Sequence, residues 1–201
     1  MRKYARIILT FSICIWSATS LGYMHTDEQL ARMNKEAEDL QRTLDGFSKN
    51  LKGELTAKYK LLRNALDVYA TAHAENELDA AGTGWADAVI AEKESVLKEF
   101  IELFRKLDSK RLKAQSELEF KKKDSELNRI YRAIQKNENL DTGVAAAPSR
   151  IGIQDTQRNW IQYRDAWLAF ANLKFSTVSQ YSLSAALTSD RIRMLKKITA
   201  E

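Results

Sequence analysis

Residues that break or cross-link a chain are scarce in this sequence. Its 201 residues include one proline, one cysteine and seven glycines. A single cysteine excludes an internal disulfide framework, and so few helix breakers in a chain rich in Ala, Leu, Lys and Glu are typical of long helices. No alternating apolar run and no hairpin dipeptide indicates a strand. We therefore predict an all-α fold, an antiparallel bundle of long helices.

Side chains that usually carry catalysis are also few. The two histidines, His25 and His73, belong to no HExxH or CxxC pattern and to no acidic cluster, so the sequence indicates no metal site. His73 is expected at the end of a helix, where a cation is favourable. No serine stands in a nucleophile elbow, and Gly82 and Gly84 are too few for a phosphate-binding loop. The sequence predicts a protein that is not an enzyme and that binds no cofactor.

Residues 1–22 have the features of an export signal. Arg2, Lys3 and Arg6 precede an apolar run over residues 7–16. That run is too short for a stable membrane anchor, and a short apolar segment after a positive start is typical of a signal peptide. An uncleaved anchor is the alternative interpretation.

The end of this segment is rich in small residues and offers cleavage after Ser20 or after Gly22. A lipoprotein is not favoured, because Cys14 lies inside the apolar run and is preceded by Ile13, where a lipobox needs a small residue. We expect a bacterial protein that is periplasmic or secreted, with no stable membrane span after cleavage.

Cleavage would change the charge of the protein. The chain has 32 Lys and Arg against 27 Asp and Glu, and removing the three cations of the signal leaves 29 against 27, a net charge of +2. The basic character is therefore partly a property of the signal, and a nucleic-acid partner is not predicted.

A heptad pattern typical of a coiled coil runs along residues 30–51. Its apolar positions are spaced alternately by three and four residues, and they are Leu30, Met33, Ala37, Leu40, Leu44, Phe47 and Leu51. The stripe continues to Tyr69, and Gly46 and Gly53 indicate a bend or a break in this long helix. With a second helix from Trp85 to about residue 107, it would form an N-terminal helical hairpin over residues 23–110.

The remaining residues, 111–201, are predicted to form a second helical unit. We expect a solvated helical stretch over residues 109–123, a loop over 137–150, and helices over 152–176 and 184–198. A shift of 91 residues places the first half on the second with few identities. The N-terminal half is therefore either a hairpin packed against the second unit or a diverged copy of the same helix-loop-helix unit.

Three motif pieces follow one another in this second unit. They are Asp124, Leu127, Asn128 and Tyr131; Gln157, Trp160, Tyr163, Arg164 and Asp165; and Leu187, Thr188, Arg191 and Leu195. Trp160 and Trp167 stand two helical turns apart with Tyr163 between them, so they share one face and are expected in the core.

In these motifs, over about residues 120–198, the chain resembles the LprI-type lysozyme-inhibitor-like family of small secreted helical domains. Many members carry cysteines just after the Arg-Asp pair and before the last helix, whereas this chain has none there. The resemblance implies that those cysteines form a disulfide. The N-terminal helices would have to supply the stability that such a disulfide contributes, about 2–5 kcal/mol.

The polar motif residues are interpreted as structural. Arg164 and Asp165 are expected to tie their helix to its neighbours, with Asn128 or Asp124 as partners. Breaking a half-buried ion pair of this kind costs about 3–5 kcal/mol, which is reason enough for such a motif.

Two functions compete at this stage. The resemblance implies a protein partner, a lysozyme or a related peptidoglycan hydrolase that the chain would inhibit, with an acidic patch over residues 75–79 as one contact. The heptad pattern favours instead an envelope adaptor or a self-associating protein that uses residues 30–51.

Overall fold

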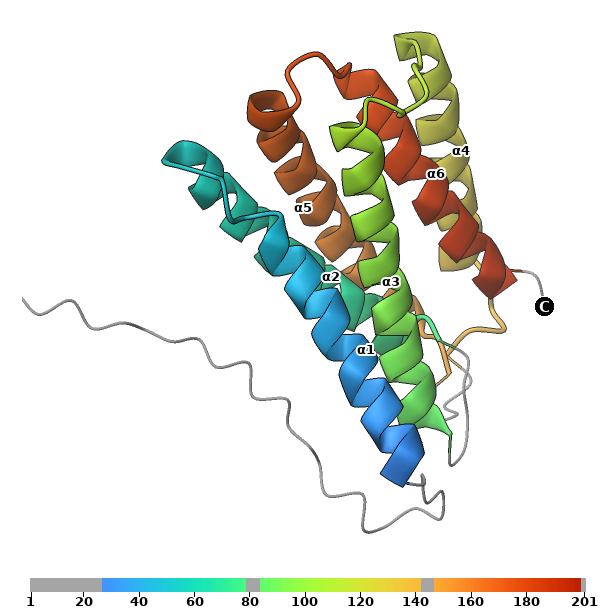
Figure 1. The fold of residues 1–201 in the computed structure, drawn as a ribbon. Helices are drawn as coiled ribbons and strands as arrows, with labels where there is room; N and C mark the ends of the chain where they lie inside the picture. Colours follow the sequence, from blue (N-terminus) through green and yellow to red (C-terminus); the bar gives the residue numbers. More distant parts are fainter. Residues whose placement is uncertain (1–26, 79–83, 142–146, 200–201) are drawn as a thin grey trace, which may run out of the picture.

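The computed structural model describes residues 27–78, 84–141 and 147–199, and the regular structure in these ranges is helical throughout. The helices are α1 (Asp27–Gly46), α2 (Glu54–Asn76), α3 (Trp85–Asp108), α4 (Glu117–Gln135), α5 (Arg150–Lys174) and α6 (Gln180–Thr199). Successive helices run in opposite directions (Figure 1), which confirms the predicted all-α antiparallel bundle. The predicted export signal lies outside the described residues.

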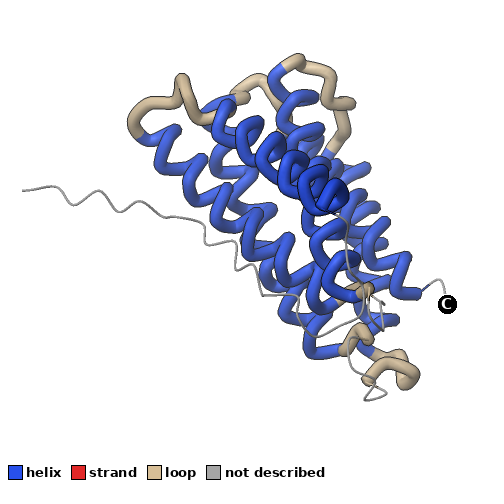
Figure 2. Tube along the Cα trace, turned by 60° about the horizontal axis from the view of Figure 1, so that its bottom comes forward, coloured by secondary structure: helices blue, strands red, loops and turns tan. Residues whose placement is uncertain are grey.

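The bundle has two ends. The loops that follow α1, α3 and α5 lie at one end, the top in Figure 1, which we call the upper end. Helices α2, α4 and α6 finish at the opposite, lower end. Seen after a 60° turn, the helices still lie side by side along one direction, with loops at both ends (Figure 2).

Residues 47–53 interrupt the long helix that the heptad pattern predicts. Helix α1 ends at Gly46, and Gly53 has a φ of 56°, a left-handed conformation that favours glycine and reverses the chain. Leu44 of the heptad pattern is buried, and Phe47 and Leu51 pack against the same core. The C-terminal part of the heptad pattern, from Leu44 to Leu51, is therefore covered by the protein's own helices.

Residues 109–116 correct the prediction of a continuous helical stretch over 109–123. Helix α3 ends at Asp108, and Lys110 adopts a positive φ of 56°. Helix α4 then starts from a capping box, in which Ser116 and Glu119 each accept a backbone hydrogen bond from the other. The last helix also begins earlier than predicted, at Gln180.

The six helices share one core. Helix α2 packs most extensively against α5, while α3 covers α2 and α6 covers α5. Helix α1 lies beside α3, and α4 lies beside α6 (Figure 1). At the centre, Phe104 contacts the rings of Tyr59, Phe100 and Trp167. Because both halves contribute to this core, each half buries its apolar face on the other.

The order of helices is compatible with the second alternative, in which the N-terminal half is a diverged copy of the C-terminal unit. A shift of 91 residues moves α1 (27–46) onto residues 118–137, close to α4 at 117–135. The same shift moves α2 onto 145–167, within reach of α5 at 150–174, and α3 onto 176–199, close to α6 at 180–199. The packing repeats as well, since the first helix of each set lies beside the third. Common ancestry of the two halves stays a prediction.

Candidate functional site

A fully buried ion pair joins the two halves of the chain. Arg191 of α6 donates to both carboxylate oxygens of Glu77, which directly follows α2, with N–O distances of 2.6 Å each. Neither side chain has any solvent exposure. A two-point contact between a guanidinium and a carboxylate is the strongest form of protein ion pair, and it fixes the relative orientation of the two groups.

The rest of the Arg191 guanidinium also has partners inside the protein. Its Nε atom donates to Oε1 of Gln157 on α5 at 2.8 Å. Its guanidinium carbon lies 6.0 Å from the ring centroid of Tyr69 on α2, and Tyr69 in turn donates to the sulfur of Met194 at 2.9 Å. One buried cation therefore holds α2, α5 and α6 together, which explains why it remains charged in the core.

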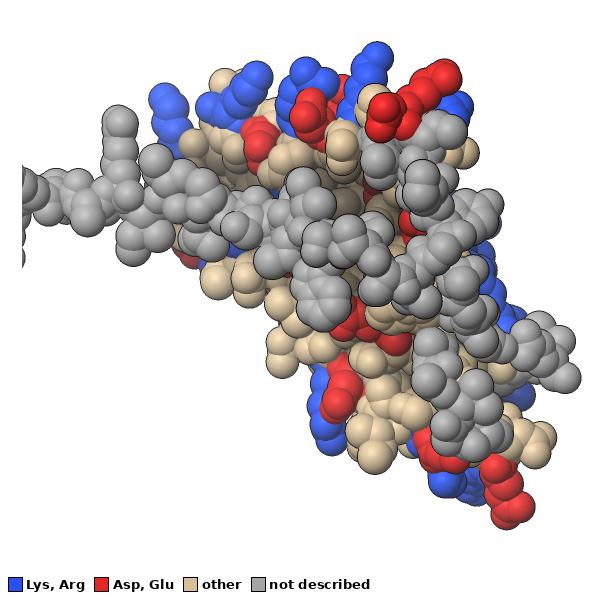
Figure 3. All heavy atoms as spheres, turned by 90° about the horizontal axis from the view of Figure 1, so that it is seen from below, with Lys and Arg blue, Asp and Glu red and all other residues tan. Residues whose placement is uncertain are grey.

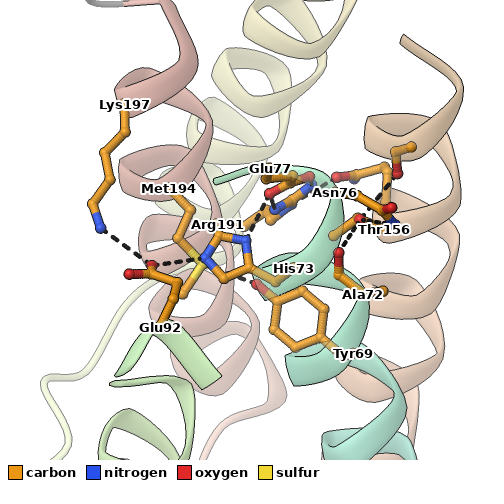
Figure 4. A network of polar contacts seen from close by, with 12 residues as sticks. Tyr69, Ala72, His73, Asn76, Glu77, Glu92, Thr156, Arg191, Met194 and Lys197 are labelled. Carbon is orange, nitrogen blue, oxygen red and sulfur yellow. Dashed lines mark hydrogen bonds and ion pairs between the residues drawn. The ribbon is translucent and has the colours of Figure 1, made fainter. Parts of the chain in front are cut away.

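His73 extends the ion pair into a network with alternating charges. Its Nδ1 lies 2.7 Å from Oε2 of Glu77, and its Nε2 lies 3.0 Å from Oε1 of Glu92 on α3. Lys197 of α6 donates to the same oxygen of Glu92 at 3.3 Å. Figure 4 shows these side chains converging from three helices. We call Glu77, Arg191, His73, Glu92 and Lys197 the charge network.

The charge network sets the protonation of its members. Burial by itself would lower the pKa of His73, but hydrogen bonds to Glu77 and Glu92 outweigh it, and the pKa is raised above its ordinary value. Burial would raise the pKa of Glu77, but the charge of Arg191 lowers it overall. The hydrogen bond from His73 lowers the pKa of Glu92 to about 2. Both carboxylates are therefore ionised, and protonated His73 is favoured.

A second group of hydrogen bonds connects α2 to α5 beside the charge network. Oγ1 of Thr156 donates to the carbonyl oxygen of Ala72 at 3.0 Å, and the amide of Asn76 donates to Thr156 at 3.3 Å (Figure 4). These bonds fix the last turn of α2, the segment that also carries His73 and precedes Glu77.

The inner part of the charge network, formed by His73, Glu77 and Arg191, is closely packed, while Lys197 is exposed. The cavity next to Arg191 measures about 20 Å³, which is room for one water molecule. Asp190 also lines this cavity, and burial raises its pKa to about 6. In the described ranges no group of three or more His, Cys, Asp or Glu is placed to hold a metal ion. No described helix is long and apolar enough to cross a membrane.

The structure brings two of the motif pieces together and leaves part of the first at the surface. Gln157 of the second piece meets Arg191 of the third. Asn128 bonds to Asp124 one turn earlier in α4, and both are accessible to solvent. The apolar motif residues line the core, Tyr131 partly and the others buried: Leu127, Leu187 and Leu195, with Thr188 buried among them.

The two aromatic residues of the second piece, and Trp167 just beyond it, lie in the core. Trp160, Tyr163 and Trp167 are all buried. The indole N–H of Trp167 donates to the hydroxyl of Tyr163 at 2.8 Å, so both polar groups are satisfied away from water. The ring of Tyr163 stacks on Tyr69 of α2, with centroids 5.2 Å apart.

Arg164 and Asp165 do not have the role predicted for them. Arg164 donates to its neighbour Asp165 at 2.8 Å and lies over the ring of Trp160, and 58% of the Asp165 side chain is exposed. The pair lies on the outer face of α5 and forms no bridge to Asn128 or Asp124. The ion pair that ties helices together is Arg191 with Glu77 instead.

Sequence reasoning missed Glu77 and His73 as members of a buried site. One signal was available for His73, because it continues the buried stripe of α2 that includes Tyr59, Leu66 and Tyr69. Glu77 gave no such signal, since it stands in an acidic stretch that is typical of a solvated helix end. The expected acidic contact over residues 75–79 is also corrected, because Glu77 is buried and paired; Asp79 lies outside the described residues.

The fold and the charge network define an all-helical protein whose two halves are joined by buried ions. The family model described as "Lysozyme inhibitor LprI" matches residues 105–195 of this chain. The resemblance inferred from the motifs is thereby confirmed, and the matched segment starts about 15 residues before the expected start at about residue 120. No curated protein and no solved structure gives a significant match.

The matched segment contains Arg191 and Gln157 but not the acids that pair with Arg191 and His73. Glu77 and Glu92 both come from the N-terminal half. The segment 105–195 therefore relies on residues outside it to neutralise its buried cation. This contact supports the expectation that the N-terminal helices stabilise a unit that lacks the family's cysteines.

Proposed function

We propose that this chain is an exported, non-catalytic protein of the bacterial envelope that binds and inhibits a lysozyme or a related peptidoglycan hydrolase. The observation that carries the proposal is the match of residues 105–195 to the lysozyme-inhibitor family model. The periplasmic or secreted location rests on the signal-like residues 1–22.

The rigidity of the bundle suits an inhibitor. Protein inhibitors of enzymes usually bind with little backbone movement, so a preformed surface loses less entropy on binding. Arg191 and Glu77 lock α2 to α6, and Trp167 and Phe100 pack the centre with ring centroids 4.8 Å apart. The binding surface would therefore be held in place before the enzyme arrives.

A mature chain with a net charge of +2 would not attract a basic hydrolase as a whole, but its charge is unevenly distributed. Six cations surround the upper end, and we call them the basic end: Lys49, Lys52, Lys110, Arg111, Lys113 and Lys174. Without these six, the 29 basic residues of the mature chain fall to 23, against 27 acidic ones. Apart from these six, the residues of the mature chain carry a net charge of −4, which includes the acids that border the upper loops, and acidic surfaces away from the basic end would attract a basic enzyme.

We place the enzyme contact at the lower end. Exposed acids there are Asp27 and Glu28 at the start of α1, Glu75 in the last turn of α2, and Glu138 after α4. Figure 3 views the molecule from below: acidic side chains are visible toward the middle of the face, and both acidic and basic ones lie along its rim. An acidic surface of this kind would speed association with a positively charged hydrolase.

The proposal is tested by titrating purified residues 23–201 into lysozymes and other peptidoglycan hydrolases and measuring turnover. We expect saturable inhibition, weakened at least tenfold by the double variant Glu75→Lys/Glu138→Lys. The matched control is Glu38→Lys/Glu54→Lys, which makes the same charge change at exposed acids on the side and the upper end. Unchanged turnover of every hydrolase at large molar excess of the protein would refute the proposal.

Self-association through α1 is the second candidate function. Helix α1 is packed mainly on α3, and a groove of about 650 Å³ lies along the two helices between Arg32 and Arg105. A second copy could occupy it with its own α1. Sedimentation of the mature protein decides this candidate, because a monomer at all concentrations removes it, and a dimer that Leu40→Glu abolishes supports it.

A further inference from the structure

The loops of the upper end contain basic residues and no acidic ones. The loop over 47–53 contains Lys49 and Lys52, and the loop over 109–116 contains Lys110, Arg111 and Lys113. The third loop, 175–179, is uncharged and is preceded by Lys174. These are the six cations of the basic end. The acids that border the three loops in the sequence are Asp45, Glu54, Asp108, Glu117 and Glu119.

The three loops are held together by one aromatic residue. Phe47 starts the first loop and stacks on Phe104 with ring centroids 3.9 Å apart. Phe175 starts the third loop and meets the edge of the same ring at 5.5 Å. Phe104 itself lies about one turn before the second loop. The backbone N–H of Gln115 also donates to Ser182 at 2.9 Å, which ties the second loop to α6. The basic end is thus one surface on a rigid base.

None of the six cations has an ion-pair partner among the described acids, although, after the hydrogen bonds from Ser116, the charge of Lys113 contributes to lowering the pKa of Glu119. Elsewhere on the described surface, lysines and arginines commonly pair with acids, as in Lys121 with Glu117 and Lys196 with Glu126. In contrast, no described acid lies within ion-pair distance of any of the six. The side chain of Arg111 donates to the hydroxyl of Ser109, and Lys174 lies over the ring of Phe175. Six unpaired cations on one face attract a surface of opposite charge.

Exposed leucines flank these cations. Leu118, in the first turn of α4, is 63% exposed, and Leu173, beside Lys174, is 43% exposed. Basic side chains interleaved with exposed aliphatic ones are typical of surfaces that lie on a membrane, where cations meet the lipid phosphates and the apolar groups enter the acyl boundary. No large aromatic side chain is exposed among the described residues of this end, and stacking on aromatics is what single-stranded nucleic acids require.

We propose that the basic end binds the surface of an anionic phospholipid membrane. Lys49, Lys52, Lys110, Arg111, Lys113 and Lys174 would contact the headgroup phosphates, while Leu118 and Leu173 reach the acyl boundary. The bundle would then stand on the membrane with its lower end directed away from it. This inference does not depend on the identity of the enzyme partner, because it uses the opposite end of the molecule.

The test is co-sedimentation of residues 23–201 with vesicles of phosphatidylcholine, with and without phosphatidylglycerol. We expect binding to the anionic vesicles, weakening as salt rises, because screening acts over about 8 Å at physiological ionic strength. The triple variant Lys110→Gln/Arg111→Gln/Lys113→Gln should lose on the order of 100-fold in affinity, at roughly fivefold for each cation. Leu118→Ser/Leu173→Ser should weaken the binding that remains at high salt.

The matched control is Arg129→Gln/Arg132→Gln/Lys136→Gln, which removes the same charge from exposed positions along α4 toward the lower end. Circular dichroism of each variant verifies that the bundle is folded. Equal losses for the two triple variants would overturn the proposal, because only net charge would matter. Absence of vesicle binding, or binding of single-stranded DNA in its place through the same three residues, would overturn it as well.

Discussion

Arg191 and Glu77 stand 114 residues apart in the sequence, yet they form a two-point ion pair with no solvent exposure on either side chain. Arg191 comes from the segment that matches the family model, and Glu77 comes from the half that does not. The pair therefore makes the fold of the matched segment depend on the N-terminal helices. Mutation of either residue measures how much the pair contributes to the free energy of unfolding.

Removing one partner of this pair should destabilise the protein strongly. Glu77→Leu leaves the Arg191 cation buried without its counter-ion, and we expect the free energy of unfolding to fall by about 3–5 kcal/mol in urea titrations. The double variant Glu77→Leu/Arg191→Met should lose much less than the sum of the two single variants, because no buried charge is left. Additive losses would contradict a coupled pair.

Stability should depend on pH through His73 and its carboxylate partners. The folded-state pKa of His73 is raised from 6.5, so its contribution is fully present below pH 6.5 and is lost as the pH rises through that raised value. The pKa of Glu92 is lowered from 4.5 to about 2, so its contribution is present above pH 4.5 and is lost as the pH falls through 2. Both contributions are fully present between pH 4.5 and pH 6.5, so the network should stabilise the fold most in that range.

Urea unfolding as a function of pH measures this effect. We expect the loss of stability above pH 6.5 to become shallower in His73→Gln, while Glu75→Gln, an exposed neighbour on the same helix, should leave the slope unchanged. A slope that is the same in wild type and His73→Gln would show that His73 does not gain a proton on folding.

Tyr163 should be needed for its hydroxyl and not only for its ring. Tyr163→Phe removes the acceptor of the Trp167 indole N–H, leaving that buried donor unsatisfied at a cost of about 1–3 kcal/mol. Ile161→Ala, on the exposed side of the same helix, should change stability by less than about 0.5 kcal/mol. Thermal unfolding of both variants tests the prediction, and a neutral Tyr163→Phe would contradict it.

Two glycines should respond oppositely to alanine. At Gly152 an added Cβ would lie 3.0 Å from Cβ of Asn76 on α2, so we expect overpacking to cost about 1–3 kcal/mol despite the helix propensity of alanine. At Gly46 nothing lies within 4 Å of the new Cβ, and alanine should stabilise by up to about 1 kcal/mol. Urea denaturation measures both, and stabilisation by Gly152→Ala would show that α2 and α5 are less tightly packed there.

Features that depend on local sequence were predictable. The interruption near Gly46 and Gly53 follows from the conformational freedom of glycine, and the burial of Trp160 and Trp167 follows from helical periodicity. The break in the helix over 109–116 was missed because the charged stretch has good helix propensity, although Ser116 and Glu119 have the spacing of a capping box.

The partners of the charged residues were decided only by the tertiary structure. Arg164 and Asp165 look like a buried pair in the sequence but lie on the outer face of α5, while His73 and Glu77 look like a solvated helix end but lie inside. The sequence by itself determined the helices, their apolar faces and the family resemblance, because these depend on residues a few positions apart. Which charges are buried depends on how α2, α3 and α6 align across more than one hundred residues, and the burial of a charge is stable only where that alignment supplies its counter-ion.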